Sequence, residues 1–348
     1  MRVLSIDGGG IRGIIPARVL VELEALTERP ISSLFDLLVG TSTGGILAMG
    51  LTVPAAAGDG ARFSASELLD IYLQEGPSIF PAPFGKAGYF GKLGFGKPTV
   101  FGRKESRQAI GAALHPGRYG NWQYAPDGLE ASLRKFFGDT RMSDLILDVI
   151  VTAYDMASSE PVLFRSREAR DSSGNPGLDP FSVDVGRATS AGPTFFPPVQ
   201  LPLSDGRIGV LADGGLAANN PSIVGFLDAV ELADAKGEDL QGITLVSLGT
   251  GIPESQQLTL EKVQGTSWLS LATRLLAILF DGTSEMQHLM IGNLLGDRYA
   301  RIQVVLREAN AAMDDATPAN LAALQADAER TVQENAALLE TFAEALVP

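Results

Sequence analysis

Three glycine-built turns carry the side chains that could do chemistry. They are Asp7-Gly8-Gly9-Gly10-Ile11-Arg12-Gly13, Gly40-Thr41-Ser42-Thr43-Gly44 and Asp213-Gly214-Gly215. The second turn follows the apolar run Leu37–Val39 and precedes a helical pattern, the context in which Gly-x-Ser-x-Gly lifts a serine hydroxyl out of a sharp strand-to-helix bend. Ser42 is therefore a candidate nucleophile. The competing interpretation is a glycine-rich turn whose serine only caps a helix.

A serine nucleophile needs a base that accepts its proton, most often a histidine. The chain has two histidines, His115 and His288, and neither lies in a glycine-rich turn. Asp213 follows the apolar run Gly209–Ala212 at the carboxyl end of an expected strand, the edge at which parallel sheets build their sites. We therefore predict a Ser–Asp dyad. The competing interpretation of Asp213 is an ordinary Asp-Gly turn.

The first turn has two interpretations. Its Gly-x-Gly-x-x-Gly spacing over residues 8–13 matches a dinucleotide-binding loop, which also needs an acidic residue at the end of the second strand. Here Asp36 precedes that strand, at the wrong end. The alternative is an oxyanion hole, in which the N–H groups of Gly9 and Gly10 face a developing alkoxide and contribute roughly 3–4 kcal/mol each. Arg12 would add positive charge beside the loop.

Two further segments accompany these turns, namely residues 186–198 (GRATSAGPTFFPP) and residues 246–251 (VSLGTG). In this order the motifs resemble those of the patatin-like phospholipases, lipid acyl hydrolases with a Ser–Asp dyad. The resemblance covers about Val3 to Thr250, and Gly192 departs from the alanine that is more common in the family. It implies a nucleophile, a general base and oxyanion donors, which would be Ser42, Asp213 and the backbone N–H groups of Gly8, Gly9, Gly10 and Thr43.

The resemblance also implies a reaction that needs no cofactor and no metal. Ser42 would attack a carboxylic ester of a phospholipid or related acyl lipid, Asp213 would accept the serine proton, and water would hydrolyse the acyl-enzyme. Because a carboxylate is a weak base, we expect burial to raise the pKa of Asp213. Two other functions stay open: a catalytically silent lipid-binding or storage protein, and a nucleotide-binding module that uses the loop Gly8–Gly13. Head group, chain length and oligomeric state are not indicated.

The composition of the chain excludes several classes of partner and site and indicates a cellular location. A formal charge of −14 argues against a nucleic-acid binder, and the absence of cysteine excludes disulfides and thiolate metal sites. A strand pattern over Arg2–Ile6 leaves no room for a signal peptide. The longest apolar helical pattern, Trp268–Phe280, is too short to cross a bilayer. We expect a cytoplasmic protein, peripheral to a membrane at most.

Short β-rich runs alternate with helical patterns, which predicts an α/β fold whose mainly parallel sheet is flanked by helices on both sides in three layers. The expected strands are Val3–Ile6, Leu37–Val39, Asp148–Thr152, Val162–Phe164, Gly209–Ala212, Thr244–Leu248 and Arg301–Val305. The expected helices are Pro16–Leu26, Gly44–Leu51, Ser66–Leu73 (opened by a capping box at Ser64), Gly128–Phe137, Pro221–Ala235 and Leu269–Phe280. We expect a catalytic domain over 1–314 and a helical C-terminal packing element over 315–348.

Residues 77–124 interrupt this alternation, being far longer than typical connections of ~4–6 residues. The segment is rich in Gly and Pro and interleaves basic with aromatic side chains: Lys86, Lys92, Lys97, Arg103, Lys104 and Arg107 with Phe80, Phe84, Tyr89, Phe90, Phe95 and Phe101. This pattern predicts a lid whose part 80–104 makes transient contact with a membrane surface. The competing interpretation is a loop folded over its own domain.

Overall fold

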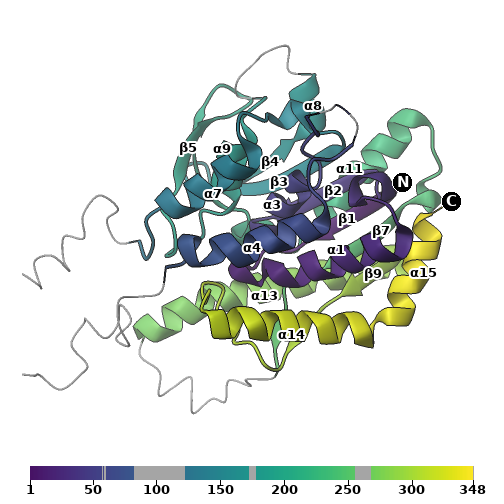
Figure 1. The fold of residues 1–348 in the computed structure, drawn as a ribbon. Coiled ribbons are helices and arrows are strands. Elements are labelled where there is room, and N and C mark those ends of the chain that lie inside the picture. The colour runs from purple at the N-terminus through teal and green to yellow at the C-terminus, as the bar shows by residue number, and fades with distance from the viewer. Residues whose placement is uncertain (57, 59, 82–121, 172–177, 255–267, 348) are drawn as a thin grey trace, which may run out of the picture.

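The centre of the protein is an eight-stranded sheet (Figure 1). The computed structural model describes residues 1–56, 58, 60–81, 122–171, 178–254 and 268–347. The strands are β1 (Arg2–Ile6), β2 (Leu37–Thr41), β3 (Asp148–Asp155), β4 (Glu160–Arg165), β5 (Val199–Pro202), β6 (Ile208–Asp213), β7 (Thr244–Leu248) and β9 (Tyr299–Ile302). Two short strands, β8 (Ile252–Pro253) and β10 (Val305–Leu306), pair separately.

Most of the sheet is parallel. In the order β5-β6-β3-β2-β1-β7-β9, the strands from β3 to β9 pair in parallel, whereas β4 and β6 run antiparallel to β3 and β5 runs antiparallel to β6. The prediction of a mainly parallel sheet is thus confirmed.

Helices cover both faces of the sheet. They are α1 (Ile14–Thr27), α2 (Ile31–Leu34), α3 (Thr43–Gly50), α4 (Ala65–Ile79), α7 (Asp127–Phe137), α8 (Ser166–Arg170), α9 (Ser182–Thr189), α10 (Gly215–Ala218), α11 (Ser222–Lys236), α13 (Trp268–Leu295), α14 (Pro318–Glu334) and α15 (Ala336–Leu346).

Alternate side chains of the strands enter two separate cores, because successive residues of a strand point to opposite faces. Leu4 and Leu38 pack with residues of α1, α3, α7 and α9 on one face. Val3, Leu37 and Val39 pack with α11 and α13 on the other. The helices therefore form the two outer layers that the sequence predicts.

Several elements differ from the sequence prediction in extent. The expected strand Arg301–Val305 is divided between β9 and β10, and the expected helix at Leu269–Phe280 continues to Leu295 as α13. The capping box is confirmed, since the Ser64 hydroxyl accepts the Glu67 N–H while the Glu67 carboxylate accepts the Ser64 N–H. Residues 82–121, which hold most of the predicted lid and membrane-contact segment as well as His115, lie outside the described residues.

The C-terminal helices pack against the N-terminal part of the chain (Figure 1). Leu321 and Leu324 of α14 share a core with Ile11 and Ile15, and Arg18 of α1 forms an ion pair with Glu329. This contact fits a packing element, while the domain boundary after residue 314 stays a prediction.

Candidate active site

Ser42 occupies a sharp turn between β2 and α3. Its backbone angles, φ 53° and ψ −121°, lie in a region that non-glycine residues rarely adopt and that is often retained at functional sites. Two glycines make the turn possible. A Cβ on Gly44 would lie 2.1 Å from the carbonyl oxygen of Ile6, and one on Gly40 would lie 2.2 Å from that of Gly44. The Gly-x-Ser-x-Gly sequence is thus dictated by close backbone packing.

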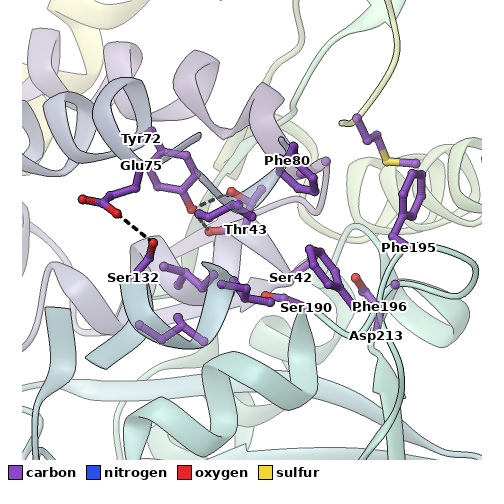
Figure 2. Close-up of a pocket in the computed structure, with 18 of the residues that line it drawn as sticks. Ser42, Thr43, Tyr72, Glu75, Phe80, Ser132, Ser190, Phe195, Phe196 and Asp213 are labelled. Atoms are coloured by element: carbon purple, nitrogen blue, oxygen red, sulfur yellow. Dashed lines mark hydrogen bonds between the residues drawn. The ribbon is translucent and has the colours of Figure 1, made fainter. Parts of the chain in front are cut away.

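Asp213 reaches Ser42 because β2 and β6 lie end to end along one edge of β3. The last residue of β2, Thr41, pairs with Thr152, and the last residue of β6, Asp213, pairs with the next residue, Ala153. Since β4 covers the other edge of β3, Ser42 and Asp213 meet where the two strands end (Figure 2). The sequence analysis expected Asp213 at the carboxyl end of a parallel strand. In the structure β6 runs antiparallel to β3, and Asp213 lies near Ser42 because β2 and β6 end at neighbouring positions of β3.

Burial shapes the electrostatics of Asp213. Its side chain is 4% exposed, and this burial raises the pKa of the carboxyl to about 6, although hydrogen bonds from the Gly215 N–H and the Ser42 hydroxyl act to lower it. Burial disfavours the charged form of any carboxyl. The result is a base with a higher proton affinity than an ordinary aspartate, beside the serine hydroxyl.

The glycine loop presents backbone N–H groups to the same site. Within the described part of the chain, the N–H groups of Gly9, Gly10 and Thr43 donate to no acceptor, and these three residues line the cavity with Ser42. The N–H of Ser42 itself is occupied, since it donates to the Thr189 hydroxyl at 2.7 Å. Unpaired amides beside a candidate nucleophile are what an oxyanion hole requires.

Two residues expected in the oxyanion hole, Gly8 and Arg12, use their hydrogen-bond donors within the protein instead. The N–H of Gly8 donates to the carbonyl oxygen of Asn219 at 3.0 Å and is therefore not free. The Arg12 side chain donates to the carbonyl oxygens of Gly9 and Gly251 and is not among the residues that line the cavity. Direct contact of Gly8 or Arg12 with an oxyanion is thus unsupported by the geometry, and both residues support the loop.

Residues far along the chain hold this loop in place. Arg301 pairs with Asp7 at 2.6 Å, with both side chains buried. The Thr250 hydroxyl donates to the Gly8 carbonyl at 2.7 Å. Gly10 has φ +59°, and a Cβ there would lie 2.2 Å from the carbonyl oxygen of Met313, which also accepts the Ile11 N–H.

One cavity joins these groups to a mostly apolar channel (Figure 2). It is walled by α4, α7 and the segment 190–196, with apolar side chains that include Ile71, Ile79, Leu133, Phe136, Phe195 and Phe280. Polar groups are few. The Ser132 hydroxyl donates to Glu75 at 3.0 Å on the side of the view opposite Asp213, and the hydroxyl of Ser190 has no partner among the described residues.

The cavity and the rest of the described structure hold no arrangement typical of a metal site. Within the described residues, no group of three or more His, Asp or Glu side chains is close enough to bind a metal ion. His288 hydrogen bonds to Tyr299 at 3.0 Å and does not line the cavity. No helix in the described part of the chain is long and apolar enough to cross a membrane.

Comparison with known proteins decides the family. Residues 4–224 match the family model described as Patatin-like phospholipase. The chain belongs to this family. It is 31% identical over 280 residues to Patatin-like protein 3 of Arabidopsis thaliana, covering 73% of this chain and 60% of that protein. It is 32% identical over 276 residues to Patatin-like protein 1 of Oryza sativa subsp. indica, covering 73% of this chain and 59% of that protein.

The chain thus matches less than two thirds of the length of these two patatin-like relatives. Among solved structures, VipD from Legionella pneumophila aligns over 98% of this chain and 67% of its own, with a TM-score of 0.39 and 15% identity. That likeness is too low to bear on the fold, which follows from the sheet order and the two helical layers described above.

Sequence reasoning singled out Ser42 and Asp213 as candidates but gave no role to several residues that surround them in the structure. Thr189 lies within the segment 186–198 that contributes to the family resemblance, but the sequence alone gives this residue no role. Asn219 lies between the expected strand Gly209–Ala212 and the expected helix Pro221–Ala235, yet its backbone carbonyl accepts the Gly8 N–H and the residue lines the cavity. No local pattern indicates Phe280 or Met313, because only the fold brings them to the site.

Proposed function

We propose that this protein is a lipid acyl hydrolase that cleaves carboxylic esters of phospholipids or related acyl lipids. The observation that carries the proposal is the pairing of Ser42, held in a strained turn, with the buried carboxyl of Asp213, whose pKa is raised to about 6. Membership of the patatin-like phospholipase family supports the substrate class. The apolar lining of the cavity suits an acyl chain.

The proposed mechanism has two steps, formation of an acyl-enzyme on Ser42 and its hydrolysis by water. Asp213 accepts the proton as Ser42 Oγ attacks the ester carbonyl, and the amides of Gly9, Gly10 and Thr43 stabilise the negative charge on the carbonyl oxygen. The proton passes from Asp213 to the leaving alcohol, which leaves Ser42 acylated. Water then attacks the acyl-enzyme, with Asp213 again accepting a proton and returning it to Ser42.

No specific observation favours the two alternative functions. A nucleotide-binding role for the loop 8–13 would place phosphate beside the same amides, yet the Gly8 N–H is occupied and the carboxyl of Asp213 adjoins the cavity. A silent lipid-binding protein would not need a serine in a strained conformation. Contact of residues 80–104 with a membrane, and a cytoplasmic location, stay predictions.

A fluorophosphonate probe tests the nucleophile directly, because it forms a covalent bond only with an activated serine. We expect mass spectrometry to place the adduct on Ser42, and Ser42→Ala to abolish both labelling and hydrolysis of a soluble short-chain ester. Ser190→Ala is the matched control, since this serine lines the same cavity and its hydroxyl has no partner among the described residues. Labelling of Ser190 in place of Ser42, or full ester turnover by Ser42→Ala, would refute the proposal.

A further inference from the structure

The outer face of α13 is apolar although it faces solvent. Seven large apolar side chains on this helix are exposed: Leu275, Ile278, Leu279, Met286, Leu289, Met290 and Leu294. Their spacing of three, four and seven residues places them on one side of the helix, and we call this set the α13 stripe. A contiguous exposed apolar patch on a protein marks an interaction site.

The opposite face of the same helix builds the candidate active site. Phe280 lines the cavity, and the Ser284 hydroxyl accepts a hydrogen bond from the Asn219 side chain at 2.9 Å. The buried side chains Ile291 and Leu295 continue this face into the core. The inner face of the helix thus contributes Phe280 to the cavity, while the α13 stripe lies on its outer face.

We propose that the α13 stripe docks the protein onto a lipid surface without net charge, such as a phosphatidylcholine bilayer. The inference rests on the proposed function, because an acyl lipid in an aggregate must reach the cavity from its surface. A helix that lines the cavity with one face and enters the apolar interface with the other would bring the two together. Exposed apolar side chains at such a surface gain stability by leaving water.

The charged side chains of α13 indicate whether the lipid surface is neutral or anionic. The exposed carboxylates of Asp281 and Glu285 flank the stripe, and the chain carries a formal charge of −14. Both features oppose approach to anionic lipid, which attracts clustered Lys and Arg. The α13 stripe thus predicts binding to neutral lipid, whereas the basic segment 80–104 predicts binding to anionic lipid.

Vesicle flotation tests the inference with a matched pair of variants. The stripe variant combines Leu279→Glu and Met286→Glu. The control combines Met156→Glu and Ile208→Glu, whose side chains are 50% and 58% exposed, comparable to 58% for Leu279 and 59% for Met286. We expect the stripe variant to lose phosphatidylcholine binding by at least about a hundredfold, while the control binds like the unmodified protein.

Turnover of a monomeric, soluble ester separates this inference from the proposed function. Equal turnover by both variants shows that the fold and the site are intact. If the unmodified protein hydrolyses no ester but the vesicle results are as expected, the proposed function fails and the docking inference stands. If the ester is cleaved but neutral vesicles do not bind, the docking inference fails alone.

Three further results would overturn the inference. Binding of the unmodified protein that appears only when phosphatidylserine is added would assign docking to basic residues, and this measurement needs no variant to fold. A dimer detected by light scattering that the stripe variant alone dissociates, with no vesicle binding, would assign the stripe to a second copy of the chain. Vesicle binding retained by a folded stripe variant would also refute it.

Discussion

Replacing Asp213 by asparagine should remove activity and, at neutral pH, make the protein more stable. Burial raises the pKa of Asp213 from 3.8 to about 6, which corresponds to about 3 kcal/mol between its two protonation states. Above pH 6 the carboxyl is ionised in both the folded and the unfolded protein, so the folded state bears the full cost of the buried charge. Below pH 3.8 it is protonated in both states, and the cost disappears.

The stability that the bound proton supplies is therefore complete below pH 3.8 and is lost as the pH rises through 6. We expect Asp213→Asn to exceed the unmodified protein by up to about 3 kcal/mol in free energy of unfolding at pH 8, and by little at pH 4. Denaturant titrations at a series of pH values measure this difference. Turnover of a soluble ester by the unmodified protein should rise with pH and reach half its maximum near pH 6. The turnover rate of Asp213→Asn should be lower by at least about a thousandfold.

Ser42→Ala is the control for this reasoning. Removing the Ser42 hydroxyl removes a hydrogen bond that lowers the pKa of Asp213. The pH at which the free energy of unfolding of this variant falls should therefore move above 6. A turnover profile of the unmodified protein that is flat between pH 5 and 8 would show that burial does not tune this carboxyl. The same conclusion would follow if the stability advantage of Asp213→Asn over the unmodified protein were no larger at pH 8 than at pH 4.

Three other substitutions test the surroundings of the site. Gly44→Ala should cost about 1–3 kcal/mol, because the new Cβ would lie 2.1 Å from a backbone oxygen, while Gly242→Ala, with no atom within 4 Å, should cost little in the same thermal unfolding assay. Thr189→Val should lower stability by about 1–3 kcal/mol by unpairing a buried amide, and Thr189→Ser should restore it. Gly192→Ala would place a methyl group 3.7 Å from an Asp213 oxygen and should move the midpoint of the turnover profile to higher pH; an unchanged midpoint would contradict this.

The sequence predicts the helical and sheet layers and the sharp turn at Ser42 because both depend on local patterns. Alternating strand and helix signals predict the sheet, and the glycines around Ser42 predict the bend. The approach of Asp213 depends instead on strand pairing. The local run Gly209–Ala212 predicts a strand, but nothing in it states that the strand runs antiparallel to β3 and ends opposite Ala153.

The glycine loop over residues 7–13 shows a second limit of local reasoning. Three consecutive glycines look equivalent in the sequence, yet the N–H of Gly8 donates to Asn219 while those of Gly9 and Gly10 have no acceptor among the described residues. The difference arises from an acceptor more than two hundred residues away along the chain. Arg12 is similar, since the positive charge expected beside an oxyanion is used by backbone carbonyls of the loop and of Gly251.

The way the glycine loop is fastened has a consequence for protein synthesis. The family match ends at residue 224, but the carbonyl of Met313 bonds to Ile11, Arg301 pairs with Asp7, and Thr250 bonds to Gly8. A chain emerging from the ribosome therefore holds Ser42 and Asp213 long before it holds the groups that shape the loop. The proposed ester hydrolysis should therefore begin only when the last third of the chain, which supplies these groups, has been made and folded.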